Sequence, residues 1–156
     1  MPTAISYMDP GLVVGCAQRW LGTPYVHQAS CQGAGTDCLG LIRGIYRELY
    51  GHEPEHTPAY TADWADVSGV ETLHDAAARH LIAIDVMDVR PGDVLLFRMV
   101  PSGPAKHAGI HVDNDRMIHA YADRAVCETQ LGRWWHARLA FAFRWPLEPS
   151  PRPISQ

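Results

Sequence analysis

The chain has 156 residues, of which 47% are hydrophobic and 19% charged, a composition typical of a single globular domain with one core. Its formal net charge of −4 provides no basic surface for a nucleic-acid backbone or an anionic membrane, so we expect neither partner. The four cysteines are irregularly spaced and contain no Cys-x-x-Cys pair, which predicts free thiols rather than a structural zinc site. The N-terminal stretch has no signal-peptide pattern, and no run of about 18 apolar residues occurs, so we expect synthesis in the cytoplasm.

Helical periodicity dominates the first third of the chain. Asp9 followed by Pro10 is a helix cap and a first-turn proline, and an apolar period of helical spacing continues to residue 21. Residues 22–36 are rich in glycine and proline and show no apolar period, which indicates a loop. The period returns at Cys38 and stops at Gly51, a residue suited to a left-handed C-cap. Two helices are therefore predicted here, and Cys38 lies in the first turn of the second.

The second half of the chain changes from a helical to a strand period. Ser68 and Glu71 match a capping box and predict a third helix that reaches residue 81. After the turn "RPGD" at 90–93, five short segments rich in β-branched or aromatic residues predict antiparallel strands; these are residues 94–100, 106–112, 116–122, 125–131 and 138–145. We therefore expect an α+β domain over residues 1–147, in which N-terminal helices pack on an antiparallel sheet of about five strands. Residues 148–156 are predicted to be a disordered proline-rich tail.

The stretch "GTDCLGLIR" at 35–43 places a cysteine where a glycine-rich loop becomes a helix. The unpaired N–H groups and the positive dipole at a helix N-terminus favour an anion, so we expect Cys38 to be mostly thiolate near neutral pH. A thiolate is the nucleophilic form of cysteine. The alternative is that Cys38 is a small buried hydrophobic residue, which is how we interpret Cys16 and Cys127. Cys31, in the preceding loop, is expected to be exposed.

Two histidines on a predicted hairpin are candidate partners for this cysteine. If Val112 pairs with Arg116, His119 lies opposite Gly109, and His107 and His119 become diagonal neighbours on one face. One imidazole could act as a general base while the other fixes its tautomer. His111 shares the face by alternation and remains a candidate for this third position. The alternatives are surface or core histidines, or a zinc site formed by the cysteine and the two histidines.

Three stretches, "LGTPYVHQAS…TDCLGLIRGIYRELYG", "RPGDVLLFR" and "HAGIHVDNDRMIHAY", resemble the NlpC-type cell-wall peptidases, which are papain-like cysteine hydrolases. The resemblance covers residues 10–145 and is greatest to the phage-tail and gene-transfer-agent group. It implies a circularly rearranged papain-like fold with Cys38 as nucleophile, His107 as general base and His119 as the orienting third member. It also implies that the Tyr25 hydroxyl contributes to the oxyanion site, although Tyr25 could instead only anchor its loop.

The same resemblance implies hydrolysis of an amide in peptidoglycan stem peptides, namely the bond between D-glutamate and the diamino acid, without a cofactor. It adds phage-tail proteins as candidate partners, with delivery to the cell wall by a particle. The chain has His27 where many relatives have tryptophan, which makes His27 a candidate substrate contact. Two alternatives remain: an amidase or acyltransferase of the same fold that acts on another amide or a lipid, and a non-catalytic tail or wall-binding module.

Overall fold

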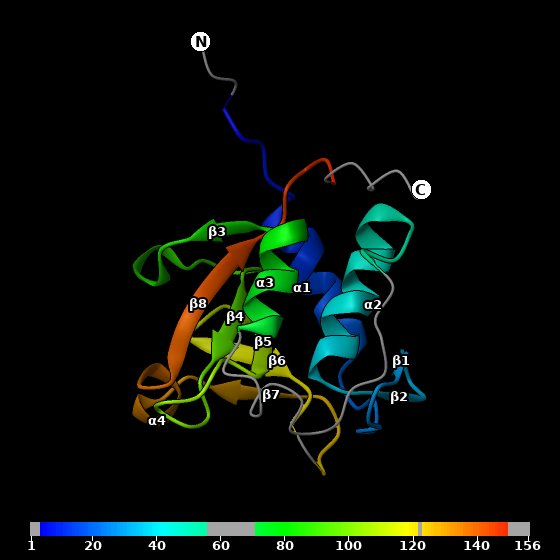
Figure 1. The fold of residues 1–156 in the computed structure, drawn as a ribbon. Helices are drawn as coiled ribbons and strands as arrows, with labels where there is room; N and C mark the ends of the chain where they lie inside the picture. The colour runs from blue at the N-terminus through cyan, green and yellow to red at the C-terminus, as the bar shows by residue number, and fades with distance from the viewer. Residues whose placement is uncertain (1–3, 56–70, 122, 150–156) are drawn as a thin grey trace.

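A computed structural model describes residues 4–55, 71–121 and 123–149 of the chain (Figure 1). Its helices are α1 (Pro10–Arg19), α2 (Cys38–Tyr50), α3 (Thr72–His80) and the short α4 (Arg133–His136), with one 3-10 turn, η1 (Val86–Asp88). Its strands are β1 (Ser30–Cys31), β2 (Gly35–Thr36), β3 (Ile82–Ile84), β4 (Val94–Phe97), β5 (His107–Val112), β6 (Arg116–His119), β7 (Cys127–Gln130) and β8 (Leu139–Arg144). No helix in this part of the chain is long and apolar enough to cross a bilayer.

The first two helices begin where the sequence predicts; α2 also ends there, whereas α1 ends at Arg19, two residues before its predicted end. The Asp9 carboxylate accepts a hydrogen bond from the Gly11 N–H at 3.1 Å, and Pro10 occupies the first turn of α1. Helix α2 begins at Cys38 and ends at Gly51, whose φ of 84° is the left-handed C-cap conformation. The local capping signals thus predicted the start of both helices and the end of α2.

Helix α3 also forms, but its predicted capping box is wrong. Glu71 is itself the N-cap and makes no side-chain capping bond, while Ser68 lies outside the described residues. The Glu71 carboxylate instead accepts hydrogen bonds from the Ala105 backbone N–H at 3.0 Å and from the Arg98 guanidinium. Because the carboxylate is engaged by the loop before β5, it fastens that loop to the start of α3.

The main sheet has six strands in the order β3-β8-β4-β5-β6-β7, and all of its pairings are antiparallel. The predicted register is confirmed, since Val112 pairs with Arg116 and Ile110 with Ile118. The sequence predicted five of these strands and missed β3, which has only three residues. It also missed β1 and β2, a small antiparallel pair inside the segment 22–36 that was expected to be loop.

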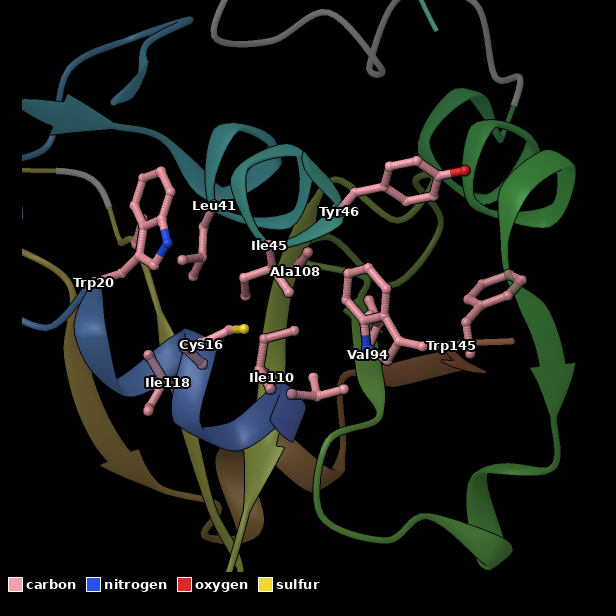
Figure 2. Close-up of a cluster of buried hydrophobic side chains, with 14 of the residues drawn as sticks. Cys16, Trp20, Leu41, Ile45, Tyr46, Val94, Ala108, Ile110, Ile118 and Trp145 are labelled. Atoms are coloured by element: carbon pink, nitrogen blue, oxygen red, sulfur yellow. The ribbon is translucent and has the colours of Figure 1, made fainter. Parts of the chain in front are cut away.

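Helices α1, α2 and α3 lie together on one side of the sheet (Figure 1), and the larger hydrophobic core fills the space between them and the sheet. Cys16 of α1 belongs to this core and is 1% exposed, as predicted. Helix α2 approaches α1 closely at Gly44, where a Cβ would lie 2.1 Å from the Trp20 ring. Figure 2 shows Trp20 beside Leu41 of α2 within the core.

A smaller core covers the opposite face of the sheet. Its buried members are Leu95, Phe97, Met117, Leu131, Trp135 and Ala142. Trp135 comes from α4, a helix that the sequence did not predict. Cys127, predicted to be a core residue, is only half-buried because β7 is the last strand of the sheet. Most of the predicted tail lies outside the described residues, so that assignment stays a prediction.

Candidate active site

Asp37 fixes the position of Cys38 at the start of α2. One oxygen of its buried carboxylate accepts the Gly40 N–H at 2.7 Å, and the other accepts the Gln28 N–H at 2.7 Å. The residue therefore caps the helix and also holds the preceding loop. That loop lies so close to α2 that a Cβ on Gly40 would be 1.9 Å from the Ala29 carbonyl oxygen. In the sequence "DCLG", Asp37 is thus the helix cap, Cys38 lies in the first turn, and Gly40 is the glycine that the close contact with the loop requires.

The Cys38 sulfur lies against the beginning of β5. It is 3.9 Å from the carbonyl oxygen of Lys106, and the backbone N–H of Ala108 also donates to it. These two residues flank His107 in the chain, so the fold brings the nucleophile candidate to the strand segment that carries the base candidate.

The charge state predicted for Cys38 is wrong in the free protein. Burial, together with the neighbouring Asp37 carboxylate, raises the pKa of the Cys38 thiol from 9.0 to about 12. Backbone N–H groups at the start of α2 act in the opposite direction, as the sequence argument supposed, but they do not outweigh desolvation. The helix terminus therefore positions the thiol without ionising it.

His107 and His119 form a buried, hydrogen-bonded pair on the sheet. Their exposed fractions are 6% and 2%, and His107 Nε2 lies 2.8 Å from His119 Nδ1. Burial, and secondarily the adjacent His119, lowers the pKa of His107 to about 3, and burial lowers that of His119 to about 4. Because Nε2 of His107 is hydrogen-bonded to His119, Nδ1 of His107 is the ring nitrogen left to exchange a proton with a substrate or thiol.

His111, the alternative third member, does not reach this pair. It faces Met117 across the hairpin, and its Nδ1 has no hydrogen-bond partner among the described residues. The geometry therefore favours His119 over His111 as the neighbour of His107.

Tyr25 and His27 lie in the loop that precedes β1. Tyr25 bridges to Thr36, which places it beside the residues that lead into Cys38. Burial raises the pKa of Tyr25, and the nearby Cys38 and Asp37 add to that rise. The His27 side chain is 40% exposed, with its Nδ1 3.9 Å from an Asp37 oxygen. Tyr25 thus adjoins the candidate nucleophile, while His27 lies on the accessible side of the same loop.

Two residues that sequence reasoning missed complete the surroundings of the histidine pair. Thr129 of β7 places its hydroxyl oxygen 2.9 Å from His119 Nε2. The Trp135 ring centroid lies 5.4 Å from that of His107 and 5.2 Å from that of His119. Thr129 could have been found by extending the strand alternation through the β6–β7 pairing, whereas no local signal indicated α4.

The zinc hypothesis does not fit this arrangement. Both ring nitrogens of His119 are already engaged, Nδ1 by His107 Nε2 and Nε2 by the Thr129 hydroxyl, so His119 has no nitrogen left for a metal shared with Cys38 and His107. Within residues 4–55, 71–121 and 123–149, no group of three or more metal-binding side chains is arranged to hold an ion. The set can instead support nucleophilic attack by sulfur with proton transfer to an imidazole.

Comparison with known proteins yields one matching family model, that of the NlpC/P60 family, over residues 22–144. The chain is 26% identical over 129 residues to a gamma-DL-glutamyl hydrolase of Bacillus subtilis, and the match covers 81% of this chain and 27% of that protein. It is 25% identical over 127 residues to the probable endopeptidase NlpC of Escherichia coli, covering 78% and 71%. The chain thus spans about a quarter of the first relative and most of the second.

Solved structures show the same fold. The NlpC/p60 domain of the peptidoglycan hydrolase SagA superposes with a TM-score of 0.59 at 23% identity, covering 87% of this chain and 98% of that one. RipD from Mycobacterium tuberculosis, described as a non-catalytic NlpC/p60 domain protein adapted to peptidoglycan binding, superposes with a TM-score of 0.53 at 14% identity, covering 88% and 98%. The α+β, papain-like fold expected from the sequence is confirmed.

Proposed function

Because the chain belongs to the NlpC/P60 family, we propose that it is a cysteine-type hydrolase that cleaves an amide bond in the stem peptides of peptidoglycan. The observation that carries this proposal is the buried, hydrogen-bonded His107–His119 pair on the strand whose backbone on both sides of His107 contacts the Cys38 sulfur, so that a nucleophile, a base and an orienting group are brought to one place. A wall-binding module would not need this set of groups.

The proposed reaction begins when Cys38 transfers its proton to His107 Nδ1 and the sulfur attacks the carbonyl carbon of the scissile amide. The oxyanion is held by the Tyr25 hydroxyl and by the backbone N–H of Cys38, which lies in the first turn of α2 where N–H groups have no intrahelical acceptor. His107 then protonates the leaving amine, and a thioester remains. Water, deprotonated by His107, cleaves the thioester and restores the thiol.

The scissile bond that we propose is the one between D-glutamate and the diamino acid. Support comes from the sequence resemblance and from the similarity to a gamma-DL-glutamyl hydrolase. His27, exposed beside the capped start of α2, is proposed to contact the substrate, so His27→Ala should raise KM more than it lowers kcat. Delivery by a phage or gene-transfer-agent particle, with tail proteins as partners, is a further proposal that rests on the sequence motifs alone.

Mass analysis of muropeptides tests the proposal directly. Sacculi that contain meso-diaminopimelate, incubated with the purified protein, should release disaccharide fragments that end in L-alanyl-D-glutamate. The matched control is Cys38→Ala, which should release none while keeping its thermal unfolding transition. Intact stems, or cleavage only between the sugar and L-alanine, would contradict the assignment.

A further inference from the structure

We propose that Thr129 is a positioning residue that holds His119 in the one tautomer compatible with general-base catalysis by His107. The inference rests on the proposed function, because it concerns the same site. Thr129 lies on β7 two residues after Cys127, which pairs with His119 across the β6–β7 ladder. From there its hydroxyl oxygen reaches His119 Nε2 at 2.9 Å.

The two hydrogen bonds of His119 are coupled through its ring. A neutral imidazole carries one N–H and one bare nitrogen, so His119 can donate on one side only if it accepts on the other. To take a proton from Cys38 at Nδ1, His107 must hold its own hydrogen on Nε2 and donate it to His119 Nδ1. His119 must then carry its hydrogen on Nε2 and donate it to Thr129 Oγ1.

The opposite arrangement would disable the base. If the Thr129 hydroxyl donated to His119 Nε2, then His119 would donate from Nδ1 to His107 Nε2. His107 would then carry its hydrogen on Nδ1, where the proton of Cys38 has to arrive. Cys127 permits the productive direction, because its sulfur lies 3.6 Å from Thr129 Oγ1 and can accept the hydroxyl hydrogen. In that arrangement the Thr129 oxygen keeps its lone pairs for the His119 N–H.

Burial makes this dependence strong. His119 is 2% exposed and Trp135 stands 5.2 Å from its ring, so little room remains for water to replace a lost acceptor. An unpaired N–H in such a place is costly, and His119 without Thr129 should shift toward the tautomer that donates to His107. The interaction therefore selects a tautomer in addition to fastening β7.

The experiment compares Thr129→Val, which keeps the shape and removes the acceptor, with Thr129→Ser, which keeps the hydroxyl. Long-range ¹H–¹⁵N correlation spectra of the imidazoles report the tautomer of His119. The rate at which iodoacetamide labels Cys38, read by peptide mapping, reports proton transfer to His107 without any substrate. Gln130→Val, an exposed substitution on the same strand, is the matched control.

Wild type should show His119 protonated on Nε2. Thr129→Val should move the proton to Nδ1 and slow Cys38 labelling about 10- to 100-fold, the range between one lost hydrogen bond and a lost general base. Thr129→Ser should restore most of the rate, and Gln130→Val should match wild type. If Thr129→Val fails to fold, Thr129→Ala on the same edge strand should show the same two changes.

Retention of the Nε2 tautomer and of wild-type labelling in Thr129→Val would overturn the inference, as would equal slowing by Thr129→Ser. These readouts involve no peptidoglycan. A wild-type protein that leaves sacculi intact but shows the tautomer change and the serine rescue would therefore refute the proposed substrate while supporting the role of Thr129.

Discussion

Cys38 and His107 should rest as a neutral thiol and a neutral imidazole before substrate binds. The pKa of the thiol is raised from 9.0 to about 12 and that of the imidazole is lowered from 6.5 to about 3, mainly by burial. At about 1.4 kcal/mol per pH unit, moving the proton from sulfur to ring therefore costs on the order of 10 kcal/mol before the two charges attract. Even two unit charges only about 4 Å apart would recover no more than about 4 kcal/mol at an effective dielectric constant near 20. The neutral pair is favoured.

This balance can be measured by titration. The ultraviolet absorbance of the thiolate in wild type, minus that of Cys38→Ala, should show no ionisation of Cys38 below about pH 9. The value of kcat/KM on a soluble stem peptide should be nearly flat from about pH 5 to about pH 9, because neither group changes charge in that window. A thiolate signal below about pH 7 that disappears in Cys38→Ala would refute the reasoning and restore the ion pair expected from the helix terminus.

Three further predictions concern stability. Between about pH 7 and about pH 5 the free energy of unfolding should fall by up to about 4 kcal/mol, because the unfolded chain protonates His107 and His119 near pH 6.5 whereas their native pKa values are about 3 and about 4. Urea denaturation should show this loss, and the variant that combines His107→Gln with His119→Gln should lack it. Gly40→Ala should cost about 1–3 kcal/mol, since its Cβ meets a backbone carbonyl oxygen at 1.9 Å, and an unchanged urea midpoint would contradict that contact. Trp135→Ala should cost about 3–5 kcal/mol by the same assay, whereas Trp134→Ala, on a side chain with 47% of its surface exposed, should cost less than about 1 kcal/mol.

Features of this fold that depend on neighbouring residues were predictable from the sequence. Asp9 and Gly51 mark helix boundaries through local caps, and the 113–115 turn fixed the hairpin register that unites His107 with His119. In these cases a few adjacent residues contain the whole physical cause.

Features that depend on distant packing were not predictable. Thr129 reaches His119 only because β7 pairs with β6, and Trp135 reaches the same ring from a four-residue helix with no apolar period. The direction of the pKa shift of Cys38 was predicted wrongly for the same reason. A helix terminus can be recognised in the sequence, but the burial that outweighs it is created by tertiary packing, including the contact with the residues at the start of β5 about 70 residues later.

The position of β8 in the sheet bears on how the protein forms during synthesis. This strand comes last in the chain, yet it lies between β3 and β4 and pairs with both. On a ribosome, β4 to β7 therefore emerge while one side of β4 still lacks its neighbour, and the sheet closes only after residue 144 has left the exit tunnel. Cys38 is synthesised more than a hundred residues before residue 144, and therefore before the sheet can close. A nascent chain should consequently carry its thiol without a finished site, and the proposed hydrolytic activity should begin only once β8 has left the exit tunnel and joined the sheet.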